Sequence, residues 1–161
     1  MAIVAAKFGF SSIVLDSKEN DTSRENRFDG RSYALALSSI RLLKNIDVFD
    51  DIRDNSQPIL DIKILDGKLV QGPSQFSLHF DNNEIHDGPM GQMVEDRFIR
   101  NALFAKIYES DQIDYKFASE VMEHKQEKGF ISVTLRNGNK LNTRLVVGAD
   151  GKNSELARRA G

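Results

Sequence analysis

Apolar residues recur at helical spacing in two long segments of the chain, residues 32–45 and residues 96–108. In each segment they stand three or four positions apart and would line one face of a helix. They are Tyr33, Leu37, Ile40 and Leu43 in the first segment, and Ile99, Leu103 and Ile107 in the second. An alanine-rich start, residues 1–8, predicts a further helix that Gly9 would stop.

Between these helices the apolar pattern takes the period of a strand. Ser12–Leu15 is an aliphatic run that predicts a buried strand with Asp16 at its end. Alternating positions in the middle of the chain predict half-buried strands. They are Leu60, Ile62 and Ile64 in one strand, Phe76, Leu78 and Phe80 in the next, and residues 92–94 in a third. Pro58 should break the chain, and Asp66-Gly67 and Asp87-Gly88-Pro89 are predicted to be turns.

In the last third of the chain, residues 113–117 predict a strand, and residues 119–123, 130–136 and 140–147 have the pattern of a meander. Asn137-Gly138 is a typical hairpin turn within it. Residues 145–147 are apolar and predict a buried strand, and Ser154 then opens a helix as its N-cap. We expect this strand and Ser12–Leu15 to share one parallel sheet, because both end in an acidic residue and carboxyl ends of parallel strands meet at one edge.

Composition narrows the class of protein without identifying it. A chain of 161 residues suits one domain, or one domain and part of another. A net charge of -2 with no basic tract argues against a nucleic-acid partner. The absence of cysteine excludes disulfides, thiolate metal sites and cysteine nucleophiles, and it suits a cytosolic protein. No apolar run approaches the length that crosses a membrane.

Two aspartates at predicted strand ends are candidate ligand-binding residues. Asp16 stands where an acidic side chain accepts both hydroxyls of a nucleotide ribose, and the alternative is a solvated aspartate in a turn. Asp150 lies in a Gly-Ala-Asp-Gly turn between a strand and a helix, where backbone amides suit a phosphate. The alternative for Asp150 is an ordinary Asp-Gly turn.

Two arginines are candidates of a second kind. Arg31 follows Asp29-Gly30, and Arg97 opens the helix predicted at 96–108. A guanidinium group donates two parallel hydrogen bonds, which suits a pyrophosphate or a carboxylate, and the alternative for each is a surface ion pair. No acid–base pair or nucleophile arrangement is recognisable, and the histidines lack metal-ligand spacing; they are His79, His86 and His124. We therefore assign no catalytic residue and no metal ligand.

Taken in order, these segments resemble the FAD-dependent aromatic hydroxylases, the single-component flavin monooxygenases, and within them the ubiquinone-biosynthesis hydroxylases. The motifs are Ile13-Val14-Leu15-Asp16, Asp29-Gly30-Arg31-Ser32-Tyr33-Ala34-Leu35 with Ser38-Ser39 and Val48-Phe49, residues 58–66, Met93-Val94-Glu95-Asp96-Arg97 with residues 99–103, and Gly148-Ala149-Asp150-Gly151-Lys152-Asn153-Ser154. The Asp-x-Arg-x-x-Ala-Leu spacing points to the ubiquinone branch. The resemblance covers nearly the whole chain.

The resemblance implies a role in FAD binding for residues of four segments. Asp16 would be the acid that binds the ribose, although the family more often has glutamate there. Arg31 would lie beside the flavin and Arg97 near the pyrophosphate. The turn around Asp150 would hold the phosphate–ribose region, with Gly148 and Gly151 as its glycines.

For the fold, the resemblance implies an α/β protein: a Rossmann-like FAD-binding domain with an inserted, mostly antiparallel β-sheet substrate domain. Residues 1–57 and 96–161 would be the two parts of the FAD-binding domain, and residues 58–95 the inserted sheet. The family's glycine-rich loop and its second Gly-Asp motif have no counterpart in these 161 residues. We therefore expect an incomplete FAD-binding domain, a fragment truncated at both ends that is inactive alone and binds FAD weakly or not at all.

For the reaction, the resemblance implies an NAD(P)H-dependent monooxygenase of ubiquinone biosynthesis. It would hydroxylate the aromatic ring of a polyprenyl phenol by way of a flavin hydroperoxide. It would be cytoplasmic, with peripheral contact at the inner membrane or membership of a ubiquinone-biosynthesis complex as options for the parent protein. The alternatives are another oxidoreductase of the FAD fold, a halogenase or a prenyl reductase, and a non-catalytic remnant.

Overall fold

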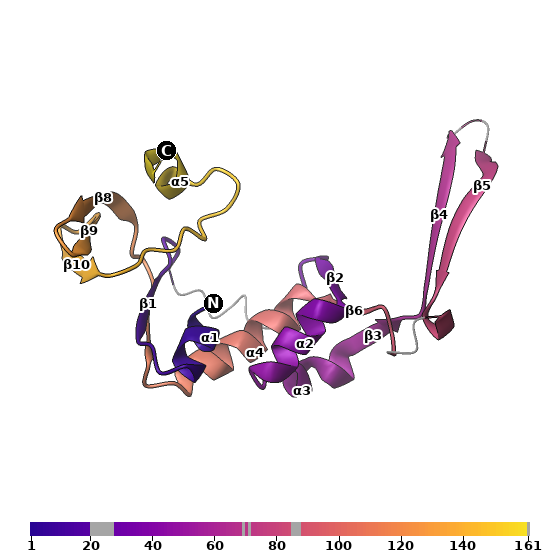
Figure 1. The fold of residues 1–161 in the computed structure, drawn as a ribbon, viewed down its shortest axis with the longest axis horizontal. Helices are drawn as coiled ribbons and strands as arrows, with labels where there is room; N and C mark the ends of the chain where they lie inside the picture. Colours follow the sequence, from indigo (N-terminus) through magenta and orange to yellow (C-terminus); the bar gives the residue numbers. More distant parts are fainter. Residues whose placement is uncertain (20–27, 69, 71, 85–87, 161) are drawn as a thin grey trace. The chain divides into compact units, whose positions relative to one another are not determined.

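The computed structural model describes residues 1–19, 28–68, 70, 72–84 and 88–160 (Figure 1). The chain divides into two compact units, Met1–Ser11 with Asp21–Ile113 and Ser12–Asn20 with Asp114–Gly161. Asp87, the first residue of the predicted 87–89 turn, lies outside the described residues. Within the described residues, no helix is long and apolar enough to cross a membrane.

The first unit has its core between helices α2 (Leu37–Asn45), α3 (Phe49–Ile52) and α4 (Asp96–Tyr108). A 3-10 turn, η2 (Arg53–Asn55), follows α3. The buried side chains of this core are all apolar; they are Ile40, Ile46, Val48, Phe49, Ile52, Val94 and Ala102. The bounds of α4 confirm the helix predicted at 96–108. Ile99 and Leu103, on its predicted apolar face, pack against this core.

Helix α1 (Ala2–Lys7) ends as the sequence predicts. Gly9 follows it with φ at +78°, a conformation that favours glycine. The amide of Gly9 donates to the carbonyl of Ala6 at 2.9 Å, and the amide of Phe10 donates to the carbonyl of Ala5 at 3.0 Å. These two bonds form a Schellman motif, which satisfies carbonyls that the end of a helix leaves unpaired.

The helices of the first unit pack with an antiparallel sheet in the order β2–β6–β3, formed by β2 (Ser32–Ala36), β6 (Gly91–Glu95) and β3 (Ser56–Ile59). The helix predicted at 32–45 is therefore wrong in its first five residues, which form β2. Each residue of β2 pairs with one of β6, from Ser32 with Glu95 to Ala36 with Gly91. This long-range pairing overrides the local helical spacing.

Pro58 does not break the chain but lies within β3, an edge strand of this sheet. An edge strand tolerates proline because one side of the strand needs no ladder hydrogen bond. Gly91 has a packing role in the central strand, since a Cβ atom at this position would overlap the carbonyl oxygen of Leu35.

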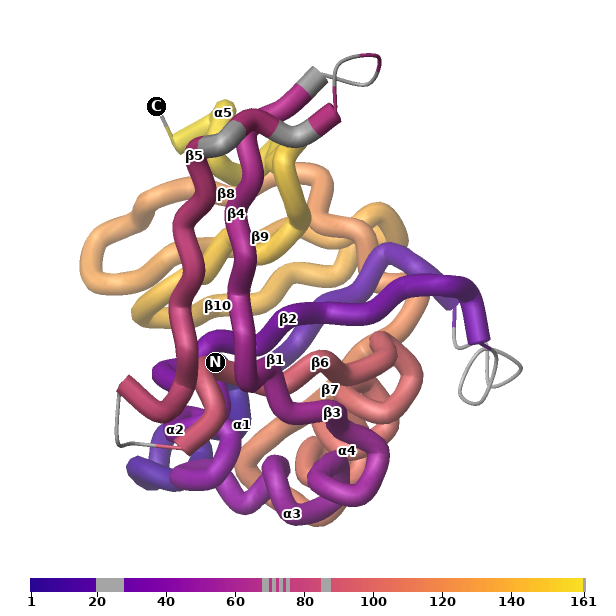
Figure 2. Tube along the Cα trace, turned by 90° about the vertical axis from the view of Figure 1, so that its right-hand side faces the viewer, coloured from indigo at the N-terminus to yellow at the C-terminus, as the bar shows by residue number. Residues whose placement is uncertain are grey.

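A two-stranded hairpin, β4 (Asp61–Lys68) and β5 (Gly72–Asp81), is inserted between β3 and β6, with a 3-10 turn, η3 (Asn82–Glu84), after it. Figure 2 shows the two strands side by side. Asp66-Gly67 is not the predicted turn, because both residues belong to β4, where the register shifts between Leu65 and Gly67. This irregularity is typical of a β-bulge, in which glycine is common.

The hairpin has one apolar face, as the alternation predicts. Ile62 pairs with Phe80 and Ile64 with Leu78, so these four side chains share a face. They are between 40% and 60% exposed, and Phe76 is 85% exposed. The predicted strands are confirmed, but the apolar face that the alternation predicted to be buried is exposed among the described residues.

In the second unit, β1 (Ser12–Leu15) pairs with β7 (Ile113–Lys116) in a two-stranded sheet. A separate meander has the order β10–β9–β8, with all pairs antiparallel, formed by β8 (Val121–Glu127), β9 (Phe130–Leu135) and β10 (Lys140–Thr143). Gly138 has φ at +85° in the turn before β10, which confirms the predicted Asn137-Gly138 hairpin.

Residues 145–147 do not form the predicted strand. Leu145 is 73% exposed and Val147 is 54% exposed. The hydroxyl of Thr143 donates to the carbonyl of Leu145 at 3.0 Å and accepts from its amide at 3.4 Å. Both backbone groups of Leu145 are thus used locally, and such a turn competes with a sheet ladder. The predicted parallel sheet of 12–15 with 145–147 is therefore wrong, and the chain is a mixed α/β protein with several antiparallel sheets.

Candidate functional site

Arg31, at the start of β2, is held by two carboxylates. Its Nε and Nη2 atoms donate to Asp29 Oδ2 at 2.8 and 2.5 Å, and Nη2 also donates to Asp96 Oδ2 at 3.0 Å. The carbonyl of Arg31 accepts the amide of Asp96 at 3.0 Å. The register that pairs Ser32 with Glu95 brings these residues together, although Arg31 and Asp96 are 65 positions apart.

Asp96 also binds a second cation. Arg100, one turn further along α4, donates from Nη2 to Asp96 Oδ2 at 2.9 Å. The hydrogen bond with Asp29, followed by the charge of Asp96, raises the pKa of Arg31. The hydrogen bond from Arg31 lowers the pKa of Asp29. These shifts favour the charged forms of Arg31 and Asp29.

Arg97 lies next to this cluster, at the start of α4. Its Nε donates to Glu95 Oε2 at 2.7 Å. Its guanidinium carbon lies 4.7 Å from the ring centre of Phe98 and 5.7 Å from that of Phe28. Two aromatic rings and a carboxylate therefore orient Arg97. Arg31 and Arg97 thus both form ion pairs, as the alternative interpretation of each residue predicts.

Asp16 follows β1 in the second unit and has two donors on its carboxylate. Oδ1 accepts the amide of Lys18 at 2.9 Å, and Oδ2 accepts the hydroxyl of Tyr115, on β7, at 2.9 Å. Its own amide donates to the carbonyl of Lys116 at 3.0 Å. Each carboxylate oxygen has two lone pairs, so both can still accept a hydroxyl.

Asp150 is bound to the helix that follows it, α5 (Glu155–Ala160). Its Oδ1 accepts the hydroxyl of Ser154, and its Oδ2 accepts the amide of Leu156 at 3.4 Å. The bond from Ser154 lowers the pKa of Asp150. Ser154 is the predicted N-cap, because its Oγ accepts the amide of Ala157 at 2.9 Å. The carboxylate of Asp150 thus complements the start of α5 directly.

The two glycines of this turn, Gly148 and Gly151, are favoured at their positions for different structural reasons. Gly151 has φ at +88°, which favours glycine. A Cβ atom on Gly148 would lie 2.8 Å from Leu156 Cδ2, so the absence of a side chain lets Leu156 pack close to the turn.

The structure brings Arg31 and Arg97 together in the first unit, and it places Asp16, Gly148, Asp150 and Gly151 in the second. Sequence reasoning missed Asp96 and Arg100, which join the arginine cluster. Their spacing of four positions at the start of a predicted helix was the available signal, because such pairs commonly interact. The pairing of Asp96 with Arg31 carried no local signal.

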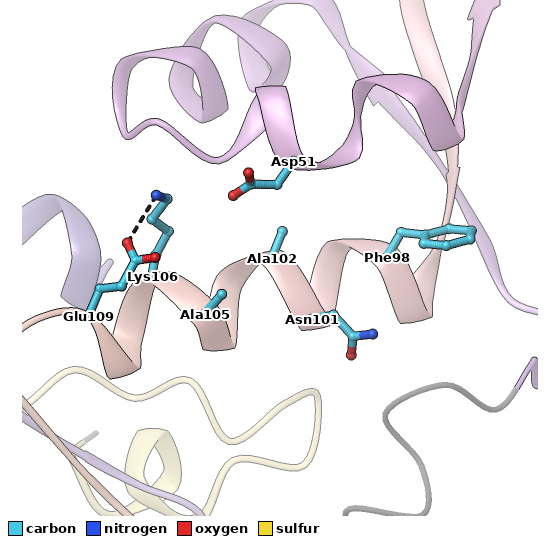
Figure 3. A pocket seen from close by; sticks show the side chains of 7 residues that line it. All are labelled: Asp51, Phe98, Asn101, Ala102, Ala105, Lys106 and Glu109. Carbon is cyan, nitrogen blue, oxygen red and sulfur yellow. Dashed lines mark hydrogen bonds and ion pairs between the residues drawn. The ribbon is translucent and has the colours of Figure 1, made fainter.

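A shallow groove of about 330 Å³ lies along α4, opposite α3 (Figure 3). Its lining residues are Asp51, Phe98, Asn101, Ala102, Ala105, Lys106 and Glu109. Lys106 Nζ donates to Glu109 Oε2 at 3.0 Å, and this bond raises the pKa of Lys106. None of the predicted site residues lines this groove, so we assign it no function.

No protein-family model matches the chain. It is 34% identical over all its 161 residues to ubiquinone hydroxylase UbiL of Rhodospirillum rubrum, of which it covers 36%. This chain is related to the ubiquinone hydroxylases. Over 83% of its length it is 29% identical to ubiquinone hydroxylase UbiM of Neisseria meningitidis, and it covers 29% of that protein. The resemblance that the motifs indicated is confirmed, and the chain spans about a third of these curated relatives.

Solved structures support the fold. The chain matches p-nitrophenol 4-monooxygenase PnpA of Pseudomonas putida with a TM-score of 0.77 at 17% identity, covering 99% of this chain and 40% of that one. It matches PqsL of Pseudomonas aeruginosa, a probable FAD-dependent monooxygenase, with a TM-score of 0.74 at 20% identity, covering 99% and 41%. This chain therefore has a fold that is also found in these monooxygenases.

Proposed function

We propose that this chain belongs to an FAD- and NAD(P)H-dependent monooxygenase that hydroxylates the aromatic ring of a polyprenyl phenol in ubiquinone biosynthesis. The observation that carries this proposal is the 34% identity to a ubiquinone hydroxylase over every residue of the chain. Fold similarity adds less, because one fold hosts many reactions. A halogenase or prenyl reductase of the same fold is not favoured, since the curated relatives are ubiquinone hydroxylases.

The cluster around Arg31 fits an anionic part of FAD. Among the described residues, no hydrogen-bond partner is found for Nη1 of Arg31, whereas Nε and Nη2 are taken by carboxylates. Arg100 Nε is buried and likewise finds no partner there. We assign Arg31 to a place beside the flavin and Arg97 to the pyrophosphate. The Nη1 atom of Arg31 and the Nε atom of Arg100 are the donors of this cluster that suit an anionic ligand.

The residues of the second unit fit the nucleotide end of FAD. We assign Asp16 to the ribose, because both its oxygens keep a lone pair after binding Lys18 and Tyr115. We assign the turn Gly148, Asp150 and Gly151 to the phosphate–ribose region. The bonds of Asp150 to Ser154 and Leu156 leave acceptor capacity on its carboxylate.

The domain assignment follows from these roles. Residues 1–57 and 96–161 would form an incomplete Rossmann-like FAD-binding domain, and residues 58–95 would be part of the inserted substrate-domain sheet. Bound FAD supplies the oxygen-transfer chemistry, with NAD(P)H as reductant. The side chains bind and orient the cofactor and the phenol and exclude water, so no acid or base among them is required. Contact with the inner membrane or a ubiquinone-biosynthesis complex belongs to the same proposal.

The first test is FAD binding by the purified chain, followed by quenching of flavin fluorescence. Of the two outcomes that the sequence leaves open, weak binding or none, the contacts of Arg31 and Asp16 favour weak, saturable binding, which Arg31→Ala should weaken further. Arg136→Ala is the matched control, because Arg136 is also an exposed arginine paired with a carboxylate, that of Glu120. Equal losses in the two variants would contradict the role of Arg31, and no binding by the wild type would contradict the cofactor assignment for this chain.

The second test concerns the reaction. The chain is mixed with FAD, NAD(P)H and a polyprenyl phenol, and mass spectrometry searches for a product with one added oxygen. Such a product would establish the hydroxylase activity and would contradict our expectation that this chain is inactive alone. Flavin binding without product would limit the chain to a cofactor-binding part of the enzyme.

A further inference from the structure

We propose that Asp96 is a positioning residue, which holds the guanidinium group of Arg31 in the orientation that binds the anionic part of the cofactor. This inference rests on the proposed function. It concerns a residue that has no role among the sequence-based predictions and that would act through Arg31 rather than on the cofactor.

Arg31 needs such a residue because its side chain is 56% exposed. An exposed arginine has many rotamers, and fixing it on binding costs conformational entropy. Asp96 fixes both ends of Arg31, since its amide donates to the Arg31 carbonyl and its Oδ2 accepts from Nη2, each at 3.0 Å. Both bonds orient Arg31 before any ligand arrives, which raises affinity by lowering that cost.

Asp96 is better placed for this role than Asp29, the other partner of Arg31. The side chain of Asp96 is 16% exposed, against 37% for Asp29, so its ion pair is less screened by solvent. Asp96 is also the first residue of α4, a helix that reaches the core through Ala102. Asp29 precedes β2, two positions from Arg31, and so restrains it only locally.

Asp96 separates two positive charges as well. Its Oδ2 binds Nη2 of Arg31 at 3.0 Å and Nη2 of Arg100 at 2.9 Å. Without the carboxylate, these guanidinium groups would repel each other, because like charges at this separation are destabilising. Arg31 would then move away from Arg100, and Nη1 would lose its fixed direction.

The test is a double-mutant cycle on FAD affinity, with flavin fluorescence as the probe. We expect Asp96→Ala to raise the dissociation constant of FAD about tenfold. Asp96→Asn should recover only part of this loss, because its amide oxygen still accepts the bond from Arg31 but carries no charge to hold Arg31 and Arg100 together. In the Arg31→Ala background, Asp96→Ala should change the affinity less than twofold, since the residue it positions is already gone.

A control and a second readout separate positioning from folding. Asp50→Ala removes a carboxylate that pairs with Arg53 and should leave FAD affinity unchanged. In nitrogen-15 NMR spectra without FAD, the Nη–H signals of Arg31 should broaden in Asp96→Ala, which removes the acceptor of Nη2, and should be unchanged in Asp50→Ala. Wild-type binding with no effect of Asp96→Ala, or losses that add in the double variant, would overturn this inference alone. A wild-type chain that does not bind FAD would instead overturn the proposed function beneath it.

Discussion

The hydroxyl of Tyr115 donates to the carboxylate of Asp16 across 2.9 Å, although the two residues are 99 positions apart. This bond joins the end of β1 to β7 and orients the acid that we assign to the ribose. Tyr115→Phe removes the bond and keeps the ring, so we expect the second unit to lose about 1 kcal/mol of stability. Amide hydrogen exchange in β1 and β7 measures the loss. Tyr108→Phe, which changes a tyrosine that is 63% exposed on α4, is the control and should leave these amides unchanged.

Ser154→Ala should destabilise α5 by about 1 kcal/mol, because the variant lacks the N-cap that accepts the amide of Ala157. The helix has six residues, so a single cap is a large part of its local stability. Faster amide exchange at residues 155–160 is the expected result. Ser77→Ala, at an exposed serine of β5, provides the comparison. Unchanged exchange in the Ser154 variant would show that Asp150 alone sustains the helix.

The same serine controls the titration of Asp150. The hydrogen bond from Ser154 lowers the pKa of Asp150 in the folded chain below the ordinary value of about 3.9. A lowered folded-state pKa stabilises the fold above the unfolded-state pKa, and this contribution disappears as pH falls through the folded-state value. Ser154→Ala should therefore raise the pKa of Asp150, seen in its carboxyl carbon-13 shift during an acid titration. An identical titration curve in the variant would refute the assigned cause.

Gly91→Ala should be far more damaging than Gly148→Ala. The new Cβ at position 91 would overlap the carbonyl oxygen of Leu35, a backbone atom of the paired strand that cannot move alone. At position 148 the contact is Leu156 Cδ2, the end of a side chain that can rotate. We expect a loss of about 1–3 kcal/mol for Gly91→Ala and a smaller one for Gly148→Ala, measured by urea unfolding. The reverse order would show that the pairing of β2 with β6 adjusts easily.

The apolar face of the hairpin should affect the exposed apolar surface of the chain more than its stability. Ile64 is 51% and Leu78 is 60% exposed, so replacing both with threonine should lower binding of the dye ANS and move the unfolding midpoint little. Val48→Thr makes a similar change at a side chain that is 0% exposed and should lower that midpoint clearly. Undiminished dye binding in the double variant would place the exposed apolar surface elsewhere.

Elements with local signals could be predicted from the sequence. Helix α4, the end of α1 at Gly9 and the cap at Ser154 each depend on residues within a few positions of one another. The first residues of the helix predicted at 32–45 form β2 instead, because their partner β6 lies far along the chain. The strand predicted at residues 145–147 is wrong for another reason. The hydroxyl of Thr143 binds the backbone of Leu145, and the apolar composition of the segment does not show this bond.

In the candidate site, too, residues with local sequence signals could be predicted and long-range pairings could not. Arg31 and Arg97 could be proposed from the chemistry of guanidinium groups and from motif order, and the structure places both near the start of α4. The spacing of Asp96 and Arg100 is visible in the sequence, but the pairing of Asp96 with Arg31 is not, because it comes from the register between β2 and β6. The roles in cofactor binding remain predictions for all six site residues, which are Asp16, Arg31, Arg97, Gly148, Asp150 and Gly151.

The segment of chain between the paired strands β2 and β6 includes the whole β4–β5 hairpin. Closing a loop costs entropy that grows only with the logarithm of its length, so doubling the enclosed segment would add about 0.6 kcal/mol. A change in the length of the hairpin should therefore alter the free energy of the β2–β6 pairing, and of the ion pairs around Arg31, only slightly. This segment can therefore change in length while the register of β2 with β6, which brings Asp96 to Arg31, stays intact.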